Sequence, residues 1–441
     1  MAKIAFIGAG SYGFTFKLVV DILSFESLKD SDLVFMDVDK GRLDNLQVIW
    51  KAYADKTNCK TQPLFTMNME EALVGADFVI NLVKIGFLEA SIQDMDVAKK
   101  FGLYQTIGDT CGVAGVFRGL RTMIFHEKLL DTMERVSSRE AVVLNYTNPQ
   151  PSLVSHAAAI SNIPFYGLCH SVQGTTQQIA RFLGIPYEEL RYEAAGINHM
   201  SWITTLERDD EDLYPAFIQR VKETGIYKTT GDDDLVLAQL GPSRLDMLQR
   251  VGYMVTESST HFPEYVPFYL RTEELREQYR IPVDQYRENI RRKTEQYEGF
   301  VDMARRGELP ELSRSVEYGP SMINSMVTGE LCRVYANVMN TGLITNLPED
   351  AAVEVACLVD ENGVHPCHYG ALPPQLAALC QSNVSVHQLA VEAVLQQDRR
   401  YIYWALMMDP VTHSMLTLDQ IETVVDELVD AQPAYLHSHF G

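Results

Sequence analysis

The sequence predicts an α/β protein in which a Rossmann-type, doubly wound parallel sheet occupies residues 1–170 and a second, α+β lobe occupies residues 171–441. Three observations favour this fold class. An apolar run near the N-terminus ends in a glycine-rich turn, strand-like and helix-like segments then alternate up to residue 183, and 441 residues suffice for two lobes.

The glycine-rich turn is the first element. Residues 3–14 read KIAFIGAGSYGF, an apolar strand followed by Gly8, Gly10 and Gly13 at G-x-G-x-x-G spacing. Gly8 permits a tight turn, Gly10 lets the backbone approach a pyrophosphate, and Gly13 lets the helix at about residues 11–23 pack closely on the strand. Ser11 opens that helix, whose free N–H groups favour negative charge. The pattern therefore predicts a dinucleotide site at Gly8, Gly10, Ser11 and Gly13.

An acidic residue supports this interpretation. The apolar run at residues 33–37, LVFMD, ends in Asp37, 24 residues after Gly13. A carboxylate at this place bonds the ribose 2′-hydroxyl of NAD and repels the 2′-phosphate of NADP. The alternative is a glycine-rich turn followed by an ordinary acidic turn at residues 37–39.

Further segments continue the alternation and imply a parallel sheet covered on both faces. Asn81 lies near the carboxyl end of its strand, where doubly wound sheets bind ligands, so we assign it to the cofactor site. Asn148 precedes Pro149, which opens a helix; its side chain either caps that helix or binds substrate. The expected strands cover residues 62–66, 77–83, 141–144 and 164–169, and the expected helices cover residues 40–56, 69–73, 115–135 and 171–183.

A cysteine and two histidines follow. The strand at residues 164–169 ends in Cys169, His170 is next, and His199 lies in a strand-like run at residues 191–207. Cys169 and His199 lack the closely spaced second pair of a zinc finger. They are either two ligands of a metal ion with open positions for substrate oxygens, or a buried thiol and a hydrogen-bonded core imidazole.

The rest of the chain gives weaker signals. Residues 210–310 read as charge-rich helices, residues 334–359 as antiparallel strands, and residues 374–407 and 418–431 as helices. The segment VHPCH at residues 364–368 has a tempting metal spacing, but its proline favours a loop.

Composition excludes several classes of function. The chain has 59 acidic and 37 basic side chains, a net charge of −22, which disfavours nucleic acid and anionic membranes as partners. No apolar stretch is long enough to span a bilayer, and the first apolar run is too short for a secretory signal. Seven scattered cysteines argue against a disulfide framework and for a reducing compartment, so we expect the protein in the cytoplasm.

Seven segments of the sequence stand in the order found in family 4 glycoside hydrolases and look most like the melibiase-type α-galactosidase branch. The resemblance runs from residue 3 to at least residue 348. Besides the glycine-rich turn, the segments are LYQTIGDTCGVAGVFRGLRT (103–122), LNYTNP (144–149), GLCHSVQGT (167–175), AGINHMSW (195–202), GYMVTESSTHFPEY (252–265) and NTGLITNLP (340–348).

The resemblance implies an NAD-dependent glycosidase that also needs a divalent metal, typically Mn²⁺, and hydrolyses α-galactosides. In such enzymes the sugar is oxidised at C3 and deprotonated at C2, the aglycone is eliminated, and water addition and reduction follow. The family alternatives are an α-glucosidase and an α-glucuronidase or α-galacturonidase. More distant alternatives are a lactate- or malate-type dehydrogenase, whose G-x-H-G stretch is missing, and a dinucleotide-sensing regulator. A homodimer or homotetramer is also implied.

The resemblance assigns roles residue by residue. Cys169 and His199 match the metal ligands, and the second lobe then carries the substrate and metal sites. Asn148 matches a residue that touches sugar hydroxyls, and Tyr265 matches the tyrosine proposed as the C2 base in several members, whereas others use an aspartate.

The general acid stays open. Asp109 falls where other members have an acidic residue in the pocket. His170 occupies the position of an aspartate proposed as the general acid in the phosphosugar branches. The acid is therefore protonated His170, Asp109 or a water molecule.

Overall fold

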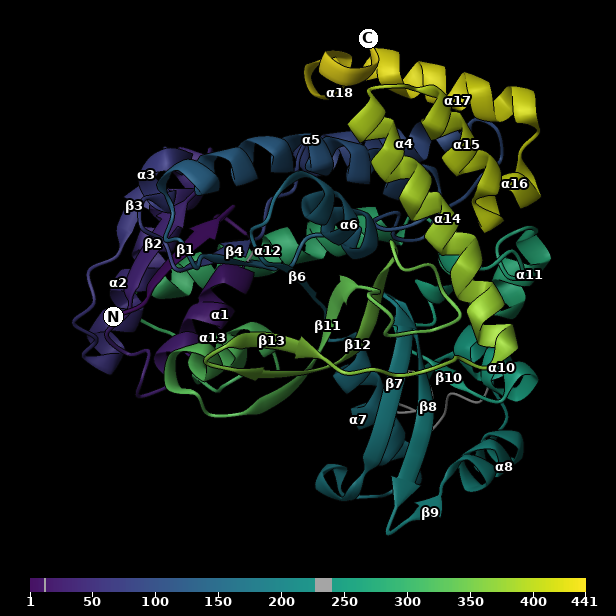
Figure 1. Cartoon of the computed structure of the whole chain (residues 1–441), viewed down its shortest axis with the longest axis horizontal. Coiled ribbons are helices and arrows are strands. Elements are labelled where there is room, and N and C mark those ends of the chain that lie inside the picture. The colour runs from purple at the N-terminus through teal and green to yellow at the C-terminus, as the bar shows by residue number, and fades with distance from the viewer. Residues whose placement is uncertain (12, 227–239) are drawn as a thin grey trace.

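The computed structural model describes residues 1–11, 13–226 and 240–441 (Figure 1). Within these residues, thirteen strands form one sheet in the order β10-β8-β7-β12-β11-β6-β5-β4-β1-β2-β3, with β9 paired to β8 and β13 paired to β12. The strands are β1 Lys3–Ile7, β2 Asp32–Met36, β3 Leu64–Thr66, β4 Phe78–Asn81, β5 Val142–Asn145, β6 Phe165–Leu168, β7 Arg191–Ile197, β8 Met200–Arg208, β9 Glu211–Asp212, β10 Met254–Val255, β11 Cys332–Met339, β12 Ala352–Asp360 and β13 Gly363–Pro366.

Helices cover both faces of this sheet (Figure 1). They are α1 Phe14–Leu23, α2 Lys40–Thr57, α3 Met69–Leu73, α4 Phe87–Lys99, α5 Gly112–Val136, α6 Gln150–Ile160, α7 Ser171–Leu183, α8 Tyr214–Thr224, α10 Pro242–Val251, α11 Glu273–Gln278, α12 Gln285–Arg305, α13 Tyr318–Thr328, α14 Pro374–Gln396, α15 Arg400–Met408, α16 Pro410–Met415, α17 Leu418–Ala431 and α18 Pro433–Phe440.

The strand β1 shows why the parallel half is doubly wound. Its residues alternate between two hydrophobic cores, because successive side chains of a strand point to opposite faces. Ile4 and Phe6 pack in one core with α1 and α2, whereas Ala5 and Ile7 pack in the other with α3, α5 and the C-terminal helices. A strand buried on both faces needs a continuous apolar run, which KIAFI supplies.

The six strands of the parallel half stand in the order β3-β2-β1-β4-β5-β6, and every neighbouring pair among them is parallel. From β1 the chain adds β2 and β3 on one side, and it then adds β4, β5 and β6 on the other side of β1. At such a reversal a ligand crevice opens at the carboxyl ends of the neighbouring strands, here β1 and β4. The predicted Rossmann-type fold class is confirmed, and the predicted strand and helix positions agree with the structure to within a few residues. The helix α4 was not predicted.

The other half of the sheet is antiparallel, with β11 joined to β6 of the parallel half and β12 joined to β7. The antiparallel strands expected within residues 334–359 are present as β11 and β12. The prediction of a single strand-like run at residues 191–207 is wrong in one respect. These residues fold as the hairpin β7–β8, and His199 lies in its turn. Residues 227–239 of the predicted helical stretch lie outside the described residues, and the proposed boundary at residue 170 stays a prediction.

The structure also describes the cysteines and the VHPCH segment. All seven cysteines are free thiols, as expected. In the VHPCH segment, His365 pairs with Asp360 at 2.9 Å and His368 lies 2.9 Å from the carbonyl oxygen of Gly342, so the two imidazoles have separate partners. Among the described helices, none is long and apolar enough to cross a membrane.

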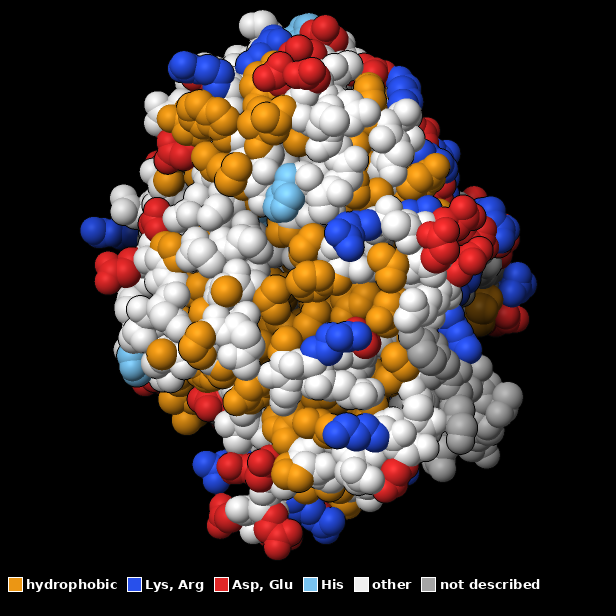
Figure 2. Space-filling model, turned by 90° about the vertical axis from the view of Figure 1, so that its right-hand side faces the viewer, with side chains coloured by type: hydrophobic (Ala, Val, Ile, Leu, Met, Phe, Trp, Pro, Cys, Tyr) orange, Lys and Arg blue, Asp and Glu red, His pale blue; other side chains and the backbone are white. Residues whose placement is uncertain are grey.

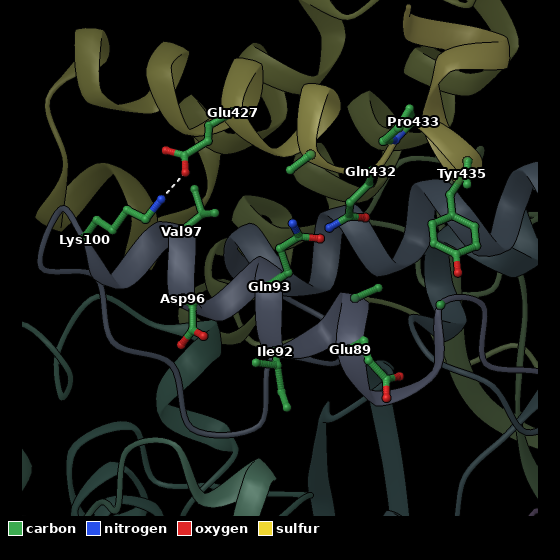
Figure 3. A pocket seen from close by; sticks show the side chains of 14 residues that line it. Glu89, Ile92, Gln93, Asp96, Val97, Lys100, Glu427, Gln432, Pro433 and Tyr435 are labelled. Atoms are coloured by element: carbon green, nitrogen blue, oxygen red, sulfur yellow. Dashed lines mark hydrogen bonds and ion pairs between the residues drawn. The ribbon is translucent and has the colours of Figure 1, made fainter.

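A cavity of 540 Å³ lies between α4 and the C-terminal helices α17 and α18 (Figure 3). Polar side chains such as Gln93 and Gln432 line it, and an ion pair between Lys100 and Glu427 closes one side. None of its lining residues is a predicted site residue.

Candidate active site

The glycine-rich turn connects β1 to α1 at the carboxyl end of β1. Gly8 adopts a φ of 81°, and a Cβ there would lie 2.9 Å from the backbone nitrogen of Val83. A Cβ at Gly10 would lie 2.5 Å from the Cβ of Arg42 and 2.8 Å from the carboxylate of Asp37. The turn therefore leaves no room for side chains at Gly8 and Gly10, as a backbone cradle for a pyrophosphate requires.

The reason for the third glycine differs from the prediction. Gly13 has a φ of 80°, and among the described residues a Cβ there would meet no atom within 4 Å. Gly13 is therefore needed for its left-handed backbone, not for close packing of the helix on the strand. The hydroxyl of Ser11 accepts a hydrogen bond from the backbone nitrogen of Thr15 at 3.0 Å, so this side chain stabilises the start of α1.

Asp37 lies directly beside this turn, at the end of β2. Its carboxylate accepts hydrogen bonds from the backbone nitrogen of Gly10 at 2.8 Å and from that of Asp39 at 2.9 Å. The side chain is thus held at the place where a ribose bound by the turn presents its hydroxyls.

Asn81, the last residue of β4, is fully buried. Its amide nitrogen donates to Asn145 at 2.8 Å and lies 3.0 Å from Nε2 of His126, while its oxygen accepts from the backbone nitrogen of Val83 at 3.2 Å. These bonds engage both ends of the amide and fix the carboxyl end of β4 against β5. Contact of Asn81 with a cofactor stays a prediction.

The two predicted metal ligands meet at one point of the fold. Cys169 directly follows β6, and His199 lies in the turn between β7 and β8 with a φ of 64°. Glu257, which follows β10 with a φ of 76°, joins them. The sulfur, an imidazole nitrogen and a carboxylate oxygen of these residues all lie within 4.8 Å of one another. Such a set of three donors suits a divalent transition metal with positions left for other oxygens.

The electrostatics of this cluster agree with a cation site. Burial and the nearby carboxyls of Glu354 and Glu257 raise the pKa of the Cys169 thiol, so it ionises only beside a positive charge. Burial lowers the pKa of His199 despite the attraction of Glu257, which keeps a lone pair available for coordination. The residues present therefore fit a divalent metal.

Tyr265 lies next to this cluster and ends the short 3₁₀ turn Phe262–Tyr265. Its hydroxyl oxygen is 2.9 Å from Nδ1 of His199, and that nitrogen is also 3.4 Å from the hydroxyl of Thr110. Burial, reinforced by Cys111 and Asp109, raises the pKa of Tyr265 well above its ordinary value of 10. The phenol thus needs a nearby cation before it can act as a base.

Asp109 forms the centre of a second group of polar side chains. Its carboxylate accepts a hydrogen bond from the amide of Asn148 at 3.0 Å and lies 3.0 Å from Nε2 of His261. Burial alone would raise the pKa of Asp109, but His261 and Arg118 outweigh it and hold this pKa well below the ordinary value. Asn148 therefore reaches into the pocket and does not cap α6, and Asp109 is an ionised carboxylate.

His261 joins the two groups. Its ring is buried, with Nε2 against Asp109 and Nδ1 3.5 Å from the carboxylate of Glu257. Burial lowers its pKa, but the attraction of Asp109 and Glu257 is larger, and the pKa lies well above 6.5. The imidazolium of His261 thus lies between the carboxylates of Glu257 and Asp109.

Glu264 fixes the loop that carries Asp109. Its carboxylate accepts hydrogen bonds from three successive backbone nitrogens, those of Thr106 at 2.6 Å, Ile107 at 2.9 Å and Gly108 at 3.1 Å. Because Glu264 and Tyr265 are adjacent, these bonds set the position of Tyr265 relative to Asp109.

His170 lies at the rim. Its side chain is 62% exposed, and Nδ1 is 3.5 Å from the carboxylate of Glu317, which also pairs with Lys17 at 2.9 Å. The His170 side chain is therefore open to solvent, whereas Tyr265 is buried.

Two basic side chains lie near Asp109. The guanidinium of Arg118 donates to the carbonyl oxygen of Asn148 at 3.0 Å. The amino nitrogen of Lys84 lies 4.4 Å from the ring centre of Tyr286, and burial together with Arg118 and Arg121 lowers the pKa of Lys84 to about 6.

Sequence reasoning missed Glu257, His261, Glu264, Lys84 and Arg118. The first three lie in the TESSTHFPEY segment, from which only Tyr265 was taken. Glu257, His261 and Glu264 are spaced by four and three residues, a pattern that could have indicated a site. The direction of each side chain, however, depends on the turn at Glu257 and on the 3₁₀ turn after it.

Two family models match the chain. The model named family 4 glycosyl hydrolase covers residues 3–185, and the model of the family 4 glycosyl hydrolase C-terminal domain covers residues 194–412. The chain belongs to the family 4 glycosyl hydrolases. The family predicted from the sequence is thereby confirmed, and the protein is a glycoside hydrolase.

Relatives of this family 4 hydrolase include two α-galactosidases. The one from Bacillus subtilis (strain 168) is 36% identical over 439 residues, covering 99% of each chain. The one from Rhizobium meliloti (strain 1021) is 32% identical over 459 residues, covering 99% of this chain and 90% of the relative. A solved 6-phospho-α-glucosidase from gut microorganisms, in complex with NAD and Mn²⁺, has a TM-score of 0.82 at 19% identity and covers 99% of both chains. That structure shows the same fold.

Proposed function

We propose that this family 4 hydrolase is an α-galactosidase that needs NAD and a divalent metal, for which Mn²⁺ is the first candidate. The observation that carries the proposal is the convergence of Cys169, His199 and Glu257 beside Asn148 and Asp109. Cys169 and Asn148 follow β6 and β5, which belong to the same parallel half-sheet as the strand before the glycine-rich turn, and His199 and Glu257 join them from the antiparallel half.

Cys169, His199 and Glu257 would hold the metal. When bound there, a divalent cation polarises vicinal oxygens of a sugar and stabilises negative charge that develops on them. Asn148, fixed by Asp109 and by Arg118, presents its amide to sugar hydroxyls on the same side of the pocket.

The turn at Gly8 and Gly10 and the start of α1 would hold the pyrophosphate of NAD, and Asp37 would accept from its ribose. Bound there, the nicotinamide would supply a reversible hydride acceptor for C3 of the sugar, with no net oxidation over the cycle. Asp109, beside the sugar-binding amide, contributes a carboxylate that accepts from a hydroxyl.

Tyr265 is the residue we assign to deprotonation at C2. Its hydroxyl oxygen lies 2.9 Å from Nδ1 of His199. With the other ring nitrogen of His199 on the metal, Nδ1 would carry the ring proton and donate a hydrogen bond to the phenolate form of Tyr265, the form that accepts the C2 proton. Glu264 holds Tyr265 in position through its bonds to the loop at residues 106–108.

The proton for the leaving oxygen needs a different group. Asp109 is ionised, and it can donate a proton only after receiving one from His261, whose Nε2 lies 3.0 Å away. His170 at the rim exchanges protons with solvent and is the second candidate. We propose the Asp109–His261 pair for the enclosed transfer and His170 for exchange with water.

The sugar is assigned from the α-galactosidase relatives. A glucoside and a uronide are the alternatives within the family, and the guanidinium of Arg118 and the amino group of Lys84 are the groups that would meet the carboxylate of a uronide. Membership of a hydrolase family counts against the lactate- or malate-type dehydrogenase.

The proposal extends to the assembly of the protein and to its location in the cell. We propose a homodimer or homotetramer in the cytoplasm, where seven free thiols are kept reduced. Figure 2 shows one face on which hydrophobic side chains gather in a central hollow, and exposed apolar groups of this kind suit a contact between subunits.

The test is hydrolysis of a nitrophenyl α-galactoside by purified protein with both NAD and Mn²⁺, with either one alone, and with neither, under reducing conditions. We expect release of nitrophenol only when both are present, without accumulation of NADH. Turnover that survives removal of both would overturn the mechanism, and stoichiometric NADH would favour a dehydrogenase. A matched panel of α-glucoside and α-galacturonide decides the sugar.

A further inference from the structure

One register row of the sheet connects the two strands that lead to the metal ligands. Gly196 of β7 is paired with Glu354 of β12, Glu354 with Asn337 of β11, and Asn337 with Gly167 of β6. His199 follows Gly196 by three residues and Cys169 follows Gly167 by two. Glu354 and Asn337 thus lie on the two strands between His199 and Cys169.

Gly167 and Gly196 both lie where a side chain would collide with a neighbouring residue. A Cβ at Gly167 would lie 2.9 Å from the Cβ of Asn337, and a Cβ at Gly196 would lie 2.6 Å from the carbonyl oxygen of Met200. Since directly paired residues point to the same face of a sheet, Glu354 and Asn337 project side by side. The amide of Asn337 donates to the carbonyl oxygen of Gly167 at 3.2 Å, which ties this row to the strand of Cys169.

Glu354 itself is fully buried, as are Asn198 and Ser201 of the hairpin that carries His199. Burial raises the pKa of the Glu354 carboxyl to about 8, and the side chains of Asn198, Asn337 and Ser201 lower it in part. Among the described residues, neither oxygen of Glu354 and neither end of the Asn198 amide has a hydrogen-bond partner. Native proteins retain unpaired buried polar atoms where these have a task other than stability.

Glu354 is also close to the metal ligands without being one of them. After burial, its charge is the largest influence on the Cys169 thiol, ahead of that of Glu257. Two groups of described residues have metal-ligand spacing, Cys169–His199–Glu257 and Asp109–His199–His261, and Glu354 belongs to neither. The carboxyl therefore lies behind the ligand set, where outer groups orient the ligands of a metal.

We propose that Glu354 is a positioning residue of the metal centre: its carboxyl, set between Asn198 and Asn337, fixes the turn of His199 at the distance from Cys169 that a divalent ion requires. This inference rests on the metal site of the proposed function. His199 has a left-handed backbone at φ 64°, which a non-glycine residue keeps only when its surroundings hold it. Asn198 precedes His199, its amide has no other hydrogen-bond partner among the described residues, and it is the residue through which we expect Glu354 to act.

The experiment measures Mn²⁺ binding directly, without turnover. Free Mn²⁺ is followed by its electron paramagnetic resonance signal in wild type, Glu354→Leu and Glu354→Gln, and NAD affinity is measured on the same samples. Co²⁺ titration gives a second readout, because coordination by the Cys169 thiolate produces a sulfur-to-cobalt charge-transfer band. Asp77→Asn is the control, because the Asp77 carboxylate accepts a hydrogen bond from the backbone nitrogen of Lys3 at the amino ends of β4 and β1, the ends opposite to the proposed site.

We expect Glu354→Leu to weaken Mn²⁺ binding by about 10- to 100-fold and to shift or reduce the Co²⁺ band, with NAD affinity unchanged. Glu354→Gln keeps polar atoms at the same places and should retain binding within about threefold of wild type. Asp77→Asn should bind Mn²⁺ as wild type does. If Glu354→Leu does not fold, Asn198→Ala removes the same link from the other side and should give the same loss.

Four outcomes overturn the inference. Unchanged Mn²⁺ binding in Glu354→Leu, or an equal loss in Glu354→Leu and Glu354→Gln, shows that polar contacts of Glu354 do not position the ligands. An equal loss of NAD affinity shows a general structural defect. If wild type itself binds no Mn²⁺, the metal site of the proposed function fails as well, which distinguishes that failure from a failure of Glu354 alone.

Discussion

The two halves of the sheet place their functional groups in different ways. In the parallel half, the glycine-rich turn and Asp37 directly follow neighbouring strands, so 37 residues of sequence contain the whole proposed NAD cradle. In the antiparallel half, His199 and Glu257 come from a hairpin turn and a short turn after β10, and they meet Cys169 only through the pairing of β7, β12, β11 and β6. A nucleotide site of this kind is local, whereas the metal site depends on long-range assembly.

If this comparison is right, the two sites can be removed separately. The largest effect is expected from Cys169→Ala, which deletes the sulfur ligand of the metal. We expect Mn²⁺ binding to disappear and hydrolysis of the α-galactoside to fall by at least about a thousandfold, since activity rests on a cation that two remaining donors hold weakly.

NAD affinity should be unchanged in Cys169→Ala, as measured by calorimetric titration, and Cys367→Ala is the control for loss of a thiol outside the cluster. Loss of NAD binding in Cys169→Ala to the same degree as Mn²⁺ binding would mean that the two sites are not independent.

The second prediction tests a group that joins neither ligand set. Tyr265→Phe removes only the hydroxyl at 2.9 Å from His199, so Mn²⁺ and NAD affinities should remain while kcat falls by about 10²- to 10⁴-fold. Wash-out of deuterium from C2 of a labelled substrate into water should slow in parallel. Wash-out at the wild-type rate would assign the C2 base to another residue, with Glu257 the nearest carboxylate of the cluster.

The same comparison explains what sequence could predict. The Rossmann-type half was readable because its signals are local: an apolar run buried on both faces, three glycines and an acid at fixed spacing. Cys169 and His199 were found through their family resemblance, since their separation of thirty residues carries no geometric information by itself.

The rest of the site depended on backbone detail that residue spacing does not contain. His199 lies in a hairpin turn and not within a strand, because the chain reverses there with a φ of 64°. Glu257 and His261 point at the cluster only because Glu257 has a left-handed backbone and a 3₁₀ turn follows. The pKa of Asp109, which decides its protonation, depends on His261, a neighbour 152 positions later in the chain.

The third prediction is the converse of the first. In Gly10→Ala, the new methyl would lie 2.5 Å from the Cβ of Arg42 and 2.8 Å from the carboxylate of Asp37, so the turn must shift. We expect NAD affinity to fall by about 100-fold, about 2.8 kcal/mol, with Mn²⁺ binding unchanged.

Gly299→Ala in α12 is the control for Gly10→Ala, because a Cβ there meets no described atom within 4 Å. NAD affinity in Gly10→Ala within threefold of wild type would contradict a pyrophosphate site at this turn.

The smallest expected effect concerns α14, the helix that connects the two halves by packing on α5 and α6 and on β7. His387 is buried on this helix, and among the described residues neither ring nitrogen has a hydrogen-bond partner. Burial lowers its pKa to about 4, so the unfolded chain binds a proton below pH 6.5 that the folded protein does not bind. Stability is therefore lost as the pH falls from 6.5 toward 4.

His387→Leu removes this titration. Between pH 7 and pH 5 we expect the free energy of unfolding to fall by about 2 kcal/mol less in the variant than in wild type, as measured by urea unfolding at both pH values. His126, buried against Asn81 in the parallel half with a pKa lowered to about 3, keeps its own contribution in both proteins. A pH dependence identical in the two proteins would show that His387 is not neutral and enclosed, and that the packing which joins the halves at α14 opens before the protein unfolds.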